Sequence, residues 1–438
     1  MIPTVTLLLL FVFIYADPDD VKPEQIHLSY GRSPDQMMVT WSTPSEISNS
    51  QVSVSDNPAF GTPKTFTGHS TKFVDGGSAH HTQYIHRTLI TGLTPGTKYY
   101  YKCSGSGGIW SAMMWFSTMK EGSAWSPRLV MFGDMGKVNA QSLPRLQQEL
   151  DLYDAALHIG DFAYDFDTDN ATVGDDFMRQ IQSVAGYLPY MTCPGNHENA
   201  YNFSNYKNRF TMPRDEDSSL KYVSFNIGPA HIVSFSTEFF YYVNYGVMQA
   251  IRQFKWLEED LKTANLPENR AKQPWIITMG HRPMYCSNAD HDDCTKDEDK
   301  VRVGVPGLHL LGLENMFEKY GVDIEMWAHE HSYERLWPVF NRKVYNGSYS
   351  EPYKNPGAPV HIVTGSAGCR ERIDKFIKYP PSWSAVRIAD YGYTRMNIYN
   401  SSHIYMEQVS DDKDGAIVDR VMVIKDRHGP YGLRSHSK

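Results

Sequence analysis

The stretch RLVMFGDMGKVNAQSLPRLQQELDLYDAALHIGDFAY, residues 128–164, decides the fold class of the larger part of this chain. It begins with an apolar run that ends at Gly133. Residues 141–153 follow, with a pattern that predicts a helix, and a second apolar run ends at Gly160. A strand, a helix and a second strand in this order are typical of a layered α/β domain.

Further segments continue this alternation downstream. Apolar runs end before Pro194, Gly280 and Ala328, and residues 246–264 carry apolar side chains at near-helical spacing. We therefore expect an α/β domain over residues 126–425, followed by a solvated tail, 426–438.

Residues 17–119 have a different pattern, with short alternating strands separated by turn residues. The phrase LITGLTPGTKYYYKC, residues 89–103, resembles the fibronectin type III pattern, in which a Gly-Leu-x-Pro-Gly-Thr turn precedes a Tyr-rich strand. We expect a β-sandwich here, which packs against the following domain or acts as a binding module. The polar segment 120–128 separates the two domains.

Composition limits the classes of partner. The chain has 438 residues, of which 41% are hydrophobic and 21% charged, and its formal net charge is −8. These values indicate a globular protein of about two domains. The acidic balance argues against nucleic acid or an anionic membrane as partner, because either would require a basic surface.

The N-terminus predicts export. Residues 1–16 resemble a secretory signal peptide, with a buried first strand as the alternative, and no later run reaches the roughly 20 apolar residues of a membrane helix. We therefore expect an extracellular or lysosomal protein. Sequons begin at four asparagines that are candidate N-glycan sites: Asn170, Asn202, Asn346 and Asn400.

The cysteine count is odd. Cys286 and Cys294 lie in a polar loop, close enough in sequence to form a disulfide. Cys103, Cys193 and Cys369 have no assigned partner.

Five strand ends carry residues that can bind metals. The motifs are GDMG, GDFAY, GNHE, GHRP and AHEH, and they supply these candidate ligands: Asp134, Asp161, Tyr164, Asn196, His281, His329 and His331. Sites in α/β sheets form at the carboxyl ends of strands. Hard oxygens and a phenol suit a trivalent ion, whereas a neutral amide and imidazoles suit a divalent one, and Asp161 is the candidate bridge.

The ordered motifs resemble those of the purple acid phosphatases, a branch of the metallophosphoesterases, and in particular the animal long form of that family. The resemblance implies two facing sheets flanked by helices. It implies Fe(III) held by Asp134, Tyr164, His331 and the bridging Asp161. It also implies a second ion, Zn, Fe or Mn. Its ligands would be Asp161 and three uncharged side chains, those of Asn196, His281 and His329.

One substitution distinguishes this branch. The wider superfamily usually opens with Asp-x-His, whereas Asp134 is followed by Met135 and Gly136, and Tyr164 ends the second motif. The exchange of a histidine for a tyrosine argues against a Mn/Mn phosphodiesterase and predicts a tyrosinate-to-iron absorption band.

The expected reaction is the hydrolysis of small or protein-borne phosphate monoesters by a metal-bound hydroxide. His197 is a candidate acid for the leaving group, and His291 is a second catalytic candidate because plant long forms carry two histidines in that loop. Glu330, between two ligands, is expected to point away from the metals.

Two alternatives remain. The first is a hydrolase of the same fold that acts on diesters, nucleotides or pyrophosphates. The second is a non-enzymatic extracellular metal-binding protein. A zincin is excluded because Tyr201 and Tyr333 occupy the positions at which HExxH would need its second histidine.

Overall fold

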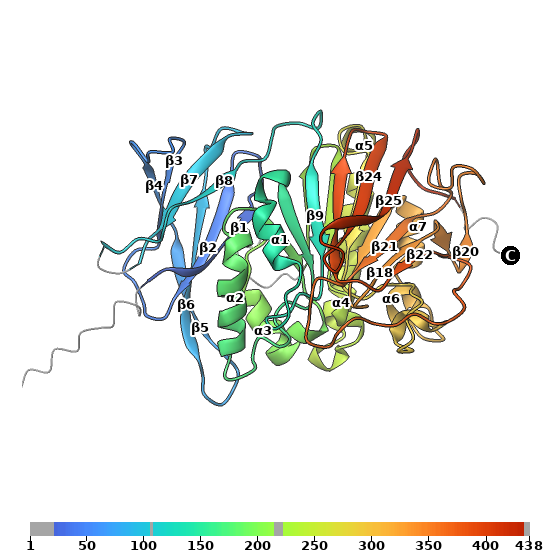
Figure 1. Ribbon diagram of the computed structural model, residues 1–438, viewed down its shortest axis with the longest axis horizontal. Helices are drawn as coiled ribbons and strands as arrows, with labels where there is room; N and C mark the ends of the chain where they lie inside the picture. The colour runs from blue at the N-terminus through green and yellow to red at the C-terminus, as the bar shows by residue number, and fades with distance from the viewer. Residues whose placement is uncertain (1–21, 106–107, 214–221, 433–438) are drawn as a thin grey trace, which may run out of the picture.

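The computed structural model describes residues 22–105, 108–213 and 222–432. Two parts of the molecule lie next to each other along its long axis (Figure 1). The N-terminal part, blue in the figure, consists of β-strands, and the remainder combines sheets with helices. This confirms the expected β plus α/β fold. The predicted signal segment, 1–16, lies outside the described residues.

The N-terminal part contains two four-stranded antiparallel sheets, with strand orders β1-β2-β6-β5 and β4-β3-β7-β8. The strands are β1 (Glu24–Tyr30), β2 (Met37–Thr43), β3 (Gln51–Ser55), β4 (Lys64–Thr67), β5 (His69–Val74), β6 (Thr82–Ile90), β7 (Lys98–Cys103) and β8 (Met114–Ser117). Met37, Val39 and Trp41 alternate along β2 and are all buried. Period-two alternation thus places these three side chains on one face, in the core.

The α/β part contains two larger sheets. The six-stranded sheet has the order β11-β10-β9-β23-β24-β25, in which β9, β10 and β11 are parallel. Its strands are β9 (Arg128–Phe132), β10 (Ala155–Ile159), β11 (Tyr190–Cys193), β23 (Gly392–Ile398), β24 (His403–Ser410) and β25 (Ala416–Ile424). The parallel strands β9 and β10 are almost wholly apolar because both faces are covered.

The seven-stranded sheet has the order β12-β13-β14-β17-β21-β18-β22, with β13, β14, β17 and β21 parallel. Its strands are β12 (Val223–Ile227), β13 (Ala230–Ser234), β14 (Trp275–Met279), β17 (Ile324–Trp327), β18 (Tyr333–Leu336), β21 (Val360–Thr364) and β22 (Ser384–Ile388). Two short ribbons pair β15 (Gly304–Val305) with β16 (Leu310–Leu311) and β19 (Val339–Phe340) with β20 (Lys343–Val344).

The helices are α1 (Leu143–Gln148), α2 (Thr172–Ala185), α3 (Ala200–Arg209), α4 (Met248–Ala264), α5 (Pro267–Arg270), α6 (Lys300–Val303) and α7 (Glu314–Tyr320). The predicted helix over 246–264 is confirmed by α4. The single helix predicted over 141–153 is wrong, because α1 ends before Glu149 and a 3₁₀ turn follows at Leu150–Leu152. The Glu149 carboxylate accepts a hydrogen bond from Tyr393 and pairs with Arg395, and its backbone leaves the helical region.

Two residues of the predicted solvated tail have tertiary partners, whereas Asp426 and Arg427 before them are exposed. The His428 ring packs edge-on against Trp275, with ring centroids 4.6 Å apart. The Tyr431 hydroxyl donates to the Val322 carbonyl over 3.0 Å. Tertiary partners at the end of the seven-stranded sheet therefore hold residues that have little hydrophobic character of their own.

A buried polar network joins the sandwich to the α/β part. The Arg209 guanidinium on α3 donates to Asp175 Oδ1 on α2 over 2.7 Å and to Gln25 Oε1 on β1 over 3.2 Å. The Asp175 carboxylate also accepts from Gln83 on β6. Burial alone would raise the pKa of Asp175, but the charge and hydrogen bond of Arg209 outweigh it and lower that pKa. In Figure 1, α2 correspondingly lies against the blue sandwich.

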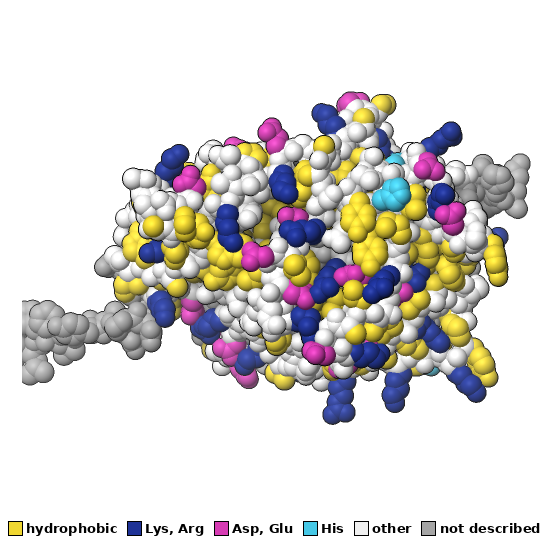
Figure 2. Space-filling view, turned by 45° about the horizontal axis from the view of Figure 1, so that its top comes forward, with side chains coloured by type: hydrophobic (Ala, Val, Ile, Leu, Met, Phe, Trp, Pro, Cys, Tyr) yellow, Lys and Arg dark blue, Asp and Glu magenta, His cyan; other side chains and the backbone are white. Residues whose placement is uncertain are grey.

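On the face of the molecule drawn in Figure 2, acidic and basic side chains are interspersed over the middle. In the part of the chain that the structure describes, none of the helices combines the length and hydrophobicity that a bilayer crossing requires. Of the predicted sequon asparagines, Asn202 is half-buried and three are exposed: Asn170, Asn346 and Asn400. Glycosylation stays a prediction.

We expect Arg209→Met to lower the free energy of unfolding by about 3–5 kcal/mol, because it removes the buried cation of Asp175 and leaves that carboxylate with His81 and Gln83. Chemical denaturation followed by fluorescence measures this change. The control is Arg179→Met, since Arg179 also joins α2 to β1 through Glu24 but is half-exposed; its expected cost is at most about 1 kcal/mol. Equal losses in the two variants would contradict a structural role for the network.

Candidate metal centre

The five polar loops predicted from the sequence meet at one place. Three of them follow the parallel strands β9, β10 and β11, and two follow β14 and β17 of the other sheet. Because parallel strands end at the same edge, each sheet contributes its loops to the same side. The candidate ligands Asp134, Asp161, Tyr164 and His329 all have positive φ, from 52° to 70°. Non-glycine residues rarely adopt this conformation, and it occurs preferentially at functional sites.

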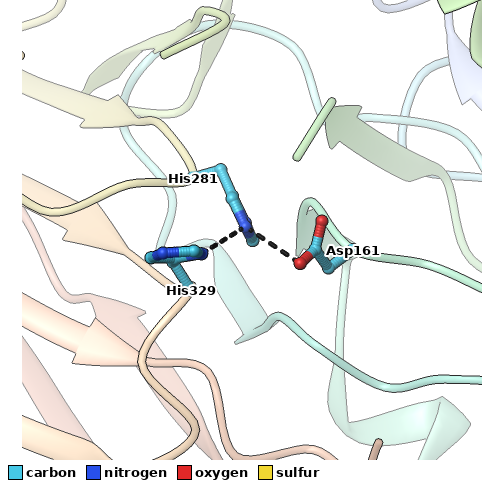
Figure 3. Close-up of side chains that lie close together, drawn as sticks. All are labelled: Asp161, His281 and His329. Atoms are coloured by element: carbon cyan, nitrogen blue, oxygen red, sulfur yellow. Dashed lines mark hydrogen bonds and ion pairs between the residues drawn. The ribbon is translucent and has the colours of Figure 1, made fainter. Parts of the chain in front are cut away.

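One group of ligand atoms surrounds His281. Its Nε2 atom lies 3.2 Å from Asp161 Oδ2, 3.1 Å from Asn196 Oδ1 and 3.2 Å from His329 Nδ1. Figure 3 shows Asp161 and the two imidazoles pointing toward one another from three separate loops. Asp161, His281 and His329 offer ligand atoms within 4.8 Å of one another. This set, with the Asn196 amide oxygen, matches the ligands predicted for the divalent ion.

The second group consists of Asp134, Tyr164 and His331. The Tyr164 hydroxyl lies 3.1 Å from Asp134 Oδ1 and 2.8 Å from His331 Nε2, and His331 Nε2 lies 3.5 Å from Asp134 Oδ1. All three side chains are buried. The structure therefore brings together the ligands predicted for the trivalent ion, apart from the bridging carboxylate.

The two groups adjoin each other. The His329 backbone N–H donates to Asp134 Oδ2 over 3.0 Å, so one residue of the first group and one of the second are directly bonded. Asp161 contacts the His281 group. Burial, followed by the charges of Asp134 and Asp161, raises the pKa of the Tyr164 phenol well above its ordinary value. The Asp161 carboxylate therefore contacts the first group and acts electrostatically on Tyr164 of the second.

The outer nitrogen of each imidazole has its own acceptor. His281 Nδ1 lies 2.8 Å from the Ile159 carbonyl oxygen, and His331 Nδ1 lies 3.1 Å from the Arg372 carbonyl oxygen. His329 Nε2 lies 2.8 Å from Asp292 Oδ2 and 3.0 Å from Arg282 Nη1. An N–H directed outward leaves the inner nitrogen with a free lone pair, which is the arrangement of a metal-binding histidine.

The side chains fit two cations. Seven buried or largely buried residues direct carboxylate, amide, phenol and imidazole atoms at two adjoining points. With burial and two carboxylates opposing its ionisation, the Tyr164 phenol would lose its proton only to a strong cation. The donor set therefore suits one hard trivalent ion beside one divalent ion.

The sequence analysis did not identify a role for Glu198, a buried residue next to the metal centre. Its carboxylate accepts from the backbone N–H groups of Asp161, Phe162 and Gly195, at 2.8, 3.0 and 2.8 Å. It therefore ties the loop after β10 to the loop after β11. Its position two residues after Asn196 in the GNHE motif was the available signal.

His197 lies at the edge of the centre. Its ring faces that of Tyr164, with centroids 4.3 Å apart, and its Nε2 atom is 3.9 Å from Asp161 Oδ2. Its Nδ1 atom lies 2.6 Å from Asp165 Oδ1, a partner that the sequence did not suggest. Burial lowers the pKa of His197, but Asp161 and Asp165 outweigh burial and raise it to about 10.

His291 is not brought into the centre. It is exposed, and among the described residues no hydrogen bond or ion pair joins it to a candidate ligand. Its neighbour Asp292 makes the contact to His329 instead. A catalytic role of His291 stays a prediction. The Cys286–Cys294 disulfide, confirmed here, closes the loop that carries both residues, and the other three cysteines are free and buried.

Glu330 is not one of the candidate ligands, although its carboxylate lies within 4.8 Å of ligand atoms of Asp292 and His329. Oxygen atoms of Glu330, Asp290 and Asp374 lie within 4.8 Å of one another. Burial, followed by the charges of these neighbours and Asp292, raises the pKa of Glu330 well above the ordinary value, so its neutral form is favoured. These contacts are consistent with the structural role expected for this side chain.

Family models match three consecutive parts of the chain. Residues 23–118 match the purple acid phosphatase N-terminal domain, residues 127–333 match the calcineurin-like phosphoesterase, and residues 358–420 match the iron/zinc purple acid phosphatase-like protein C. The candidate ligands all lie within the second match.

Relatives cover nearly the whole chain. Acid phosphatase type 7 of Danio rerio is 53% identical over 96% of both chains, and the Homo sapiens protein of the same name is 54% identical over 93% of this chain and 92% of its own. Among solved structures, a purple acid phosphatase from yellow lupin (Lupinus luteus) seeds aligns with a TM-score of 0.78 and 24% identity. That alignment covers 93% of this chain and 75% of the lupin chain. The lupin protein thus shares the fold.

We expect Asp292→Ala to weaken binding of the divalent ion about 10- to 100-fold, because His329 loses the acceptor that orients its ring. Titration of the metal-free protein with Zn²⁺ measures the affinity without requiring turnover. Glu298→Gln, which removes an exposed carboxylate further along the same segment, is the matched control and should bind as the wild type does. An unchanged affinity in Asp292→Ala would show that the Asp292 contact does not position the ligand.

Proposed function

This chain belongs to the purple acid phosphatase family, and from that premise we propose that it hydrolyses phosphate monoesters at a centre of Fe(III) and a divalent ion. The observation that supports the proposal best is the pair of adjoining ligand groups, in which three histidines direct their inner nitrogens at the centre. The substrates are small molecules or protein-borne phosphate monoesters.

The two groups divide the ions between them. Asp134, Tyr164 and His331 would hold Fe(III), and the His281 group would hold Zn, Fe or Mn, with Asp161 shared. A match to an iron/zinc family model supports this choice of metals. When bound, two such ions supply Lewis-acid stabilisation of the phosphate and activation of water.

His197 would donate the proton that the leaving oxygen needs. Its Nδ1 atom is bonded to Asp165, so its Nε2 atom is free to face the reacting group beside Asp161. Because Asp165 holds one ring nitrogen, the imidazolium keeps its orientation while the other nitrogen donates. Asp165 is therefore a positioning residue.

We also propose that the protein follows the secretory pathway to the cell exterior or the lysosome. The Cys286–Cys294 disulfide supports this, since disulfides persist in oxidising compartments. The four sequons are consistent with the same route.

The purified protein should contain two equivalents of metal, at least one of them iron, and show a visible tyrosinate-to-iron band. It should hydrolyse p-nitrophenyl phosphate in preference to bis(p-nitrophenyl) phosphate. Tyr164→Phe should abolish the band, because the phenolate that gives rise to it is removed. Tyr30→Phe, which changes a buried tyrosine of the sandwich, should keep it. Retention of both band and iron in Tyr164→Phe would overturn the assignment.

His197→Asn should lower turnover of an alkyl phosphate by about 10²- to 10⁴-fold, the usual contribution of a positioned acid. The loss with p-nitrophenyl phosphate should be smaller, because its leaving group hardly needs a proton. The metal content of His197→Asn should match that of the wild type. The control is His403→Asn, at the start of β24. Equal losses for both substrates would argue against proton donation by His197.

A further inference from the structure

A cluster of three carboxylates lies beside the metal centre, and neither ligand group contains any of them. Oxygen atoms of Asp290, Glu330 and Asp374 lie within 4.8 Å of one another. The three residues come from three segments, which are the loop closed by the Cys286–Cys294 disulfide, the loop after β17 and the loop after Cys369. We call this set the acidic cluster.

The acidic cluster adjoins the outer side of two imidazoles of the centre. Asp292, in the same loop as Asp290, has its Oδ2 atom 2.8 Å from His329 Nε2, and Asp374 Oδ2 lies 4.0 Å from His331 Nδ1. These two nitrogens are the outer ones, whereas the inner nitrogens of both rings face other candidate ligands. The acidic cluster is therefore separate from the two points at which the ions of the centre would bind.

Glu330 is a buried carboxylate without a hydrogen-bond donor. The residue is 1% exposed, and its Oε2 atom has no partner among the residues that the structure describes. Its Oε1 atom lies 3.0 Å from Cys294 Sγ, but this sulfur belongs to the disulfide and carries no hydrogen. Asp290 and Asp374 only accept hydrogen bonds when they are ionised. Because a buried charge without a partner is strongly disfavoured, Glu330 requires either a proton or a cation.

Basic side chains do not neutralise the acidic cluster. Within the described ranges, no lysine or arginine forms an ion pair with any of its three carboxylates. Arg282 reaches the disulfide-closed loop, but it pairs there with Asp293. Backbone N–H groups meet one oxygen each of Asp290 and Asp374. The remaining oxygens of the cluster are therefore available to a cation from solution.

A second buried oxygen without a donor flanks the acidic cluster. Asn288 is fully buried, its Nδ2 atom donates to Ser332 Oγ over 2.9 Å, and its Oδ1 atom has no partner in the described part of the chain. Ser332 follows Glu330 by two residues. An antiparallel bridge between Asn288 and Phe376 holds the disulfide-closed loop against the loop after Cys369. The Asn288 amide thus lies where the three segments of the cluster meet, and amide oxygens are common ligands of calcium.

We propose that the acidic cluster binds one Ca²⁺ ion, in addition to the two ions of the metal centre. An all-oxygen set suits a hard cation, and oxygens bound to one Ca²⁺ at about 2.3–2.6 Å lie within roughly 5 Å of one another. Asp290 is exposed and gives the ion access from solvent. The ion would join three segments, two of which contact His329 and His331. It would therefore stabilise the loops around the centre, whatever reaction the centre catalyses.

Calcium binding to the metal-loaded full chain tests the site. In equilibrium dialysis the wild-type protein should bind one equivalent of Ca²⁺ with a Kd of about 10⁻⁴–10⁻³ M, the range of extracellular calcium modules. Asp290→Asn removes the exposed carboxylate and keeps its shape. It should weaken calcium binding at least about tenfold, because affinity for Ca²⁺ depends on the number of charged ligands. Glu330→Gln should have the same effect.

Thermal unfolding gives an independent measurement. Saturating Ca²⁺ should raise the Tm of the wild-type protein by about 1–3 °C, since a ligand that binds only the folded state stabilises it. The Tm of Asp290→Asn should not change. The control is Glu298→Gln, which removes an exposed carboxylate further along the chain and should keep both the affinity and the Tm shift. Mg²⁺ should bind more weakly than Ca²⁺, because it requires a smaller octahedral shell.

Three results would overturn the proposal. If the wild-type protein binds no Ca²⁺, a proton shared by Glu330 and Asp290 neutralises the cluster instead. If Asp290→Asn binds Ca²⁺ as tightly as the wild type does, the ion binds elsewhere on the surface. If added Ca²⁺ releases iron or the divalent ion, measured in the same dialysis, it enters the metal centre rather than the acidic cluster. Equal affinities for Mg²⁺ and Ca²⁺ would contradict the choice of the larger ion.

Discussion

The three histidines of the centre are oriented by the acceptors on their outer nitrogens. Ile159 and Arg372 supply carbonyl oxygens and Asp292 a carboxylate, so each ring presents its remaining nitrogen to other candidate ligands. Without these outer bonds the rings could rotate and the inner lone pairs would no longer converge. The capacity to hold two cations therefore depends on residues that do not touch the metals.

The sheets make this convergence possible. Loops after β9, β10 and β11 meet loops after β14 and β17, and the two sets belong to different sheets. Positive φ at Asp134, Asp161 and His329 turns the backbone sharply enough to direct neighbouring side chains into one volume. Glu198 then fixes two of these loops through their N–H groups.

Residues outside the two ligand groups hold the neighbouring loops and the N-terminal sandwich in place around the centre. A disulfide closes the loop that brings Asp292 to His329, and the loop after Cys369 places the Arg372 carbonyl oxygen at His331. The N-terminal sandwich is held through Arg209 and Asp175, which connect β1 to the helices next to the centre. The loops and helices around the centre are therefore held by residues outside the two ligand groups.

The sequence by itself determined the two-part fold and the five strand-end motifs and indicated a possible Cys286–Cys294 disulfide, because these depend on local periodicity and short spacing. Only the tertiary structure decided that Asp165 orients His197, that Asp292 rather than His291 reaches His329, and that His428 packs on Trp275. The end of α1 before Glu149 was likewise decided by tertiary structure. Such contacts depend on how loops from separate sheets pack, and no local pattern encodes the distance between side chains that lie far apart in the chain.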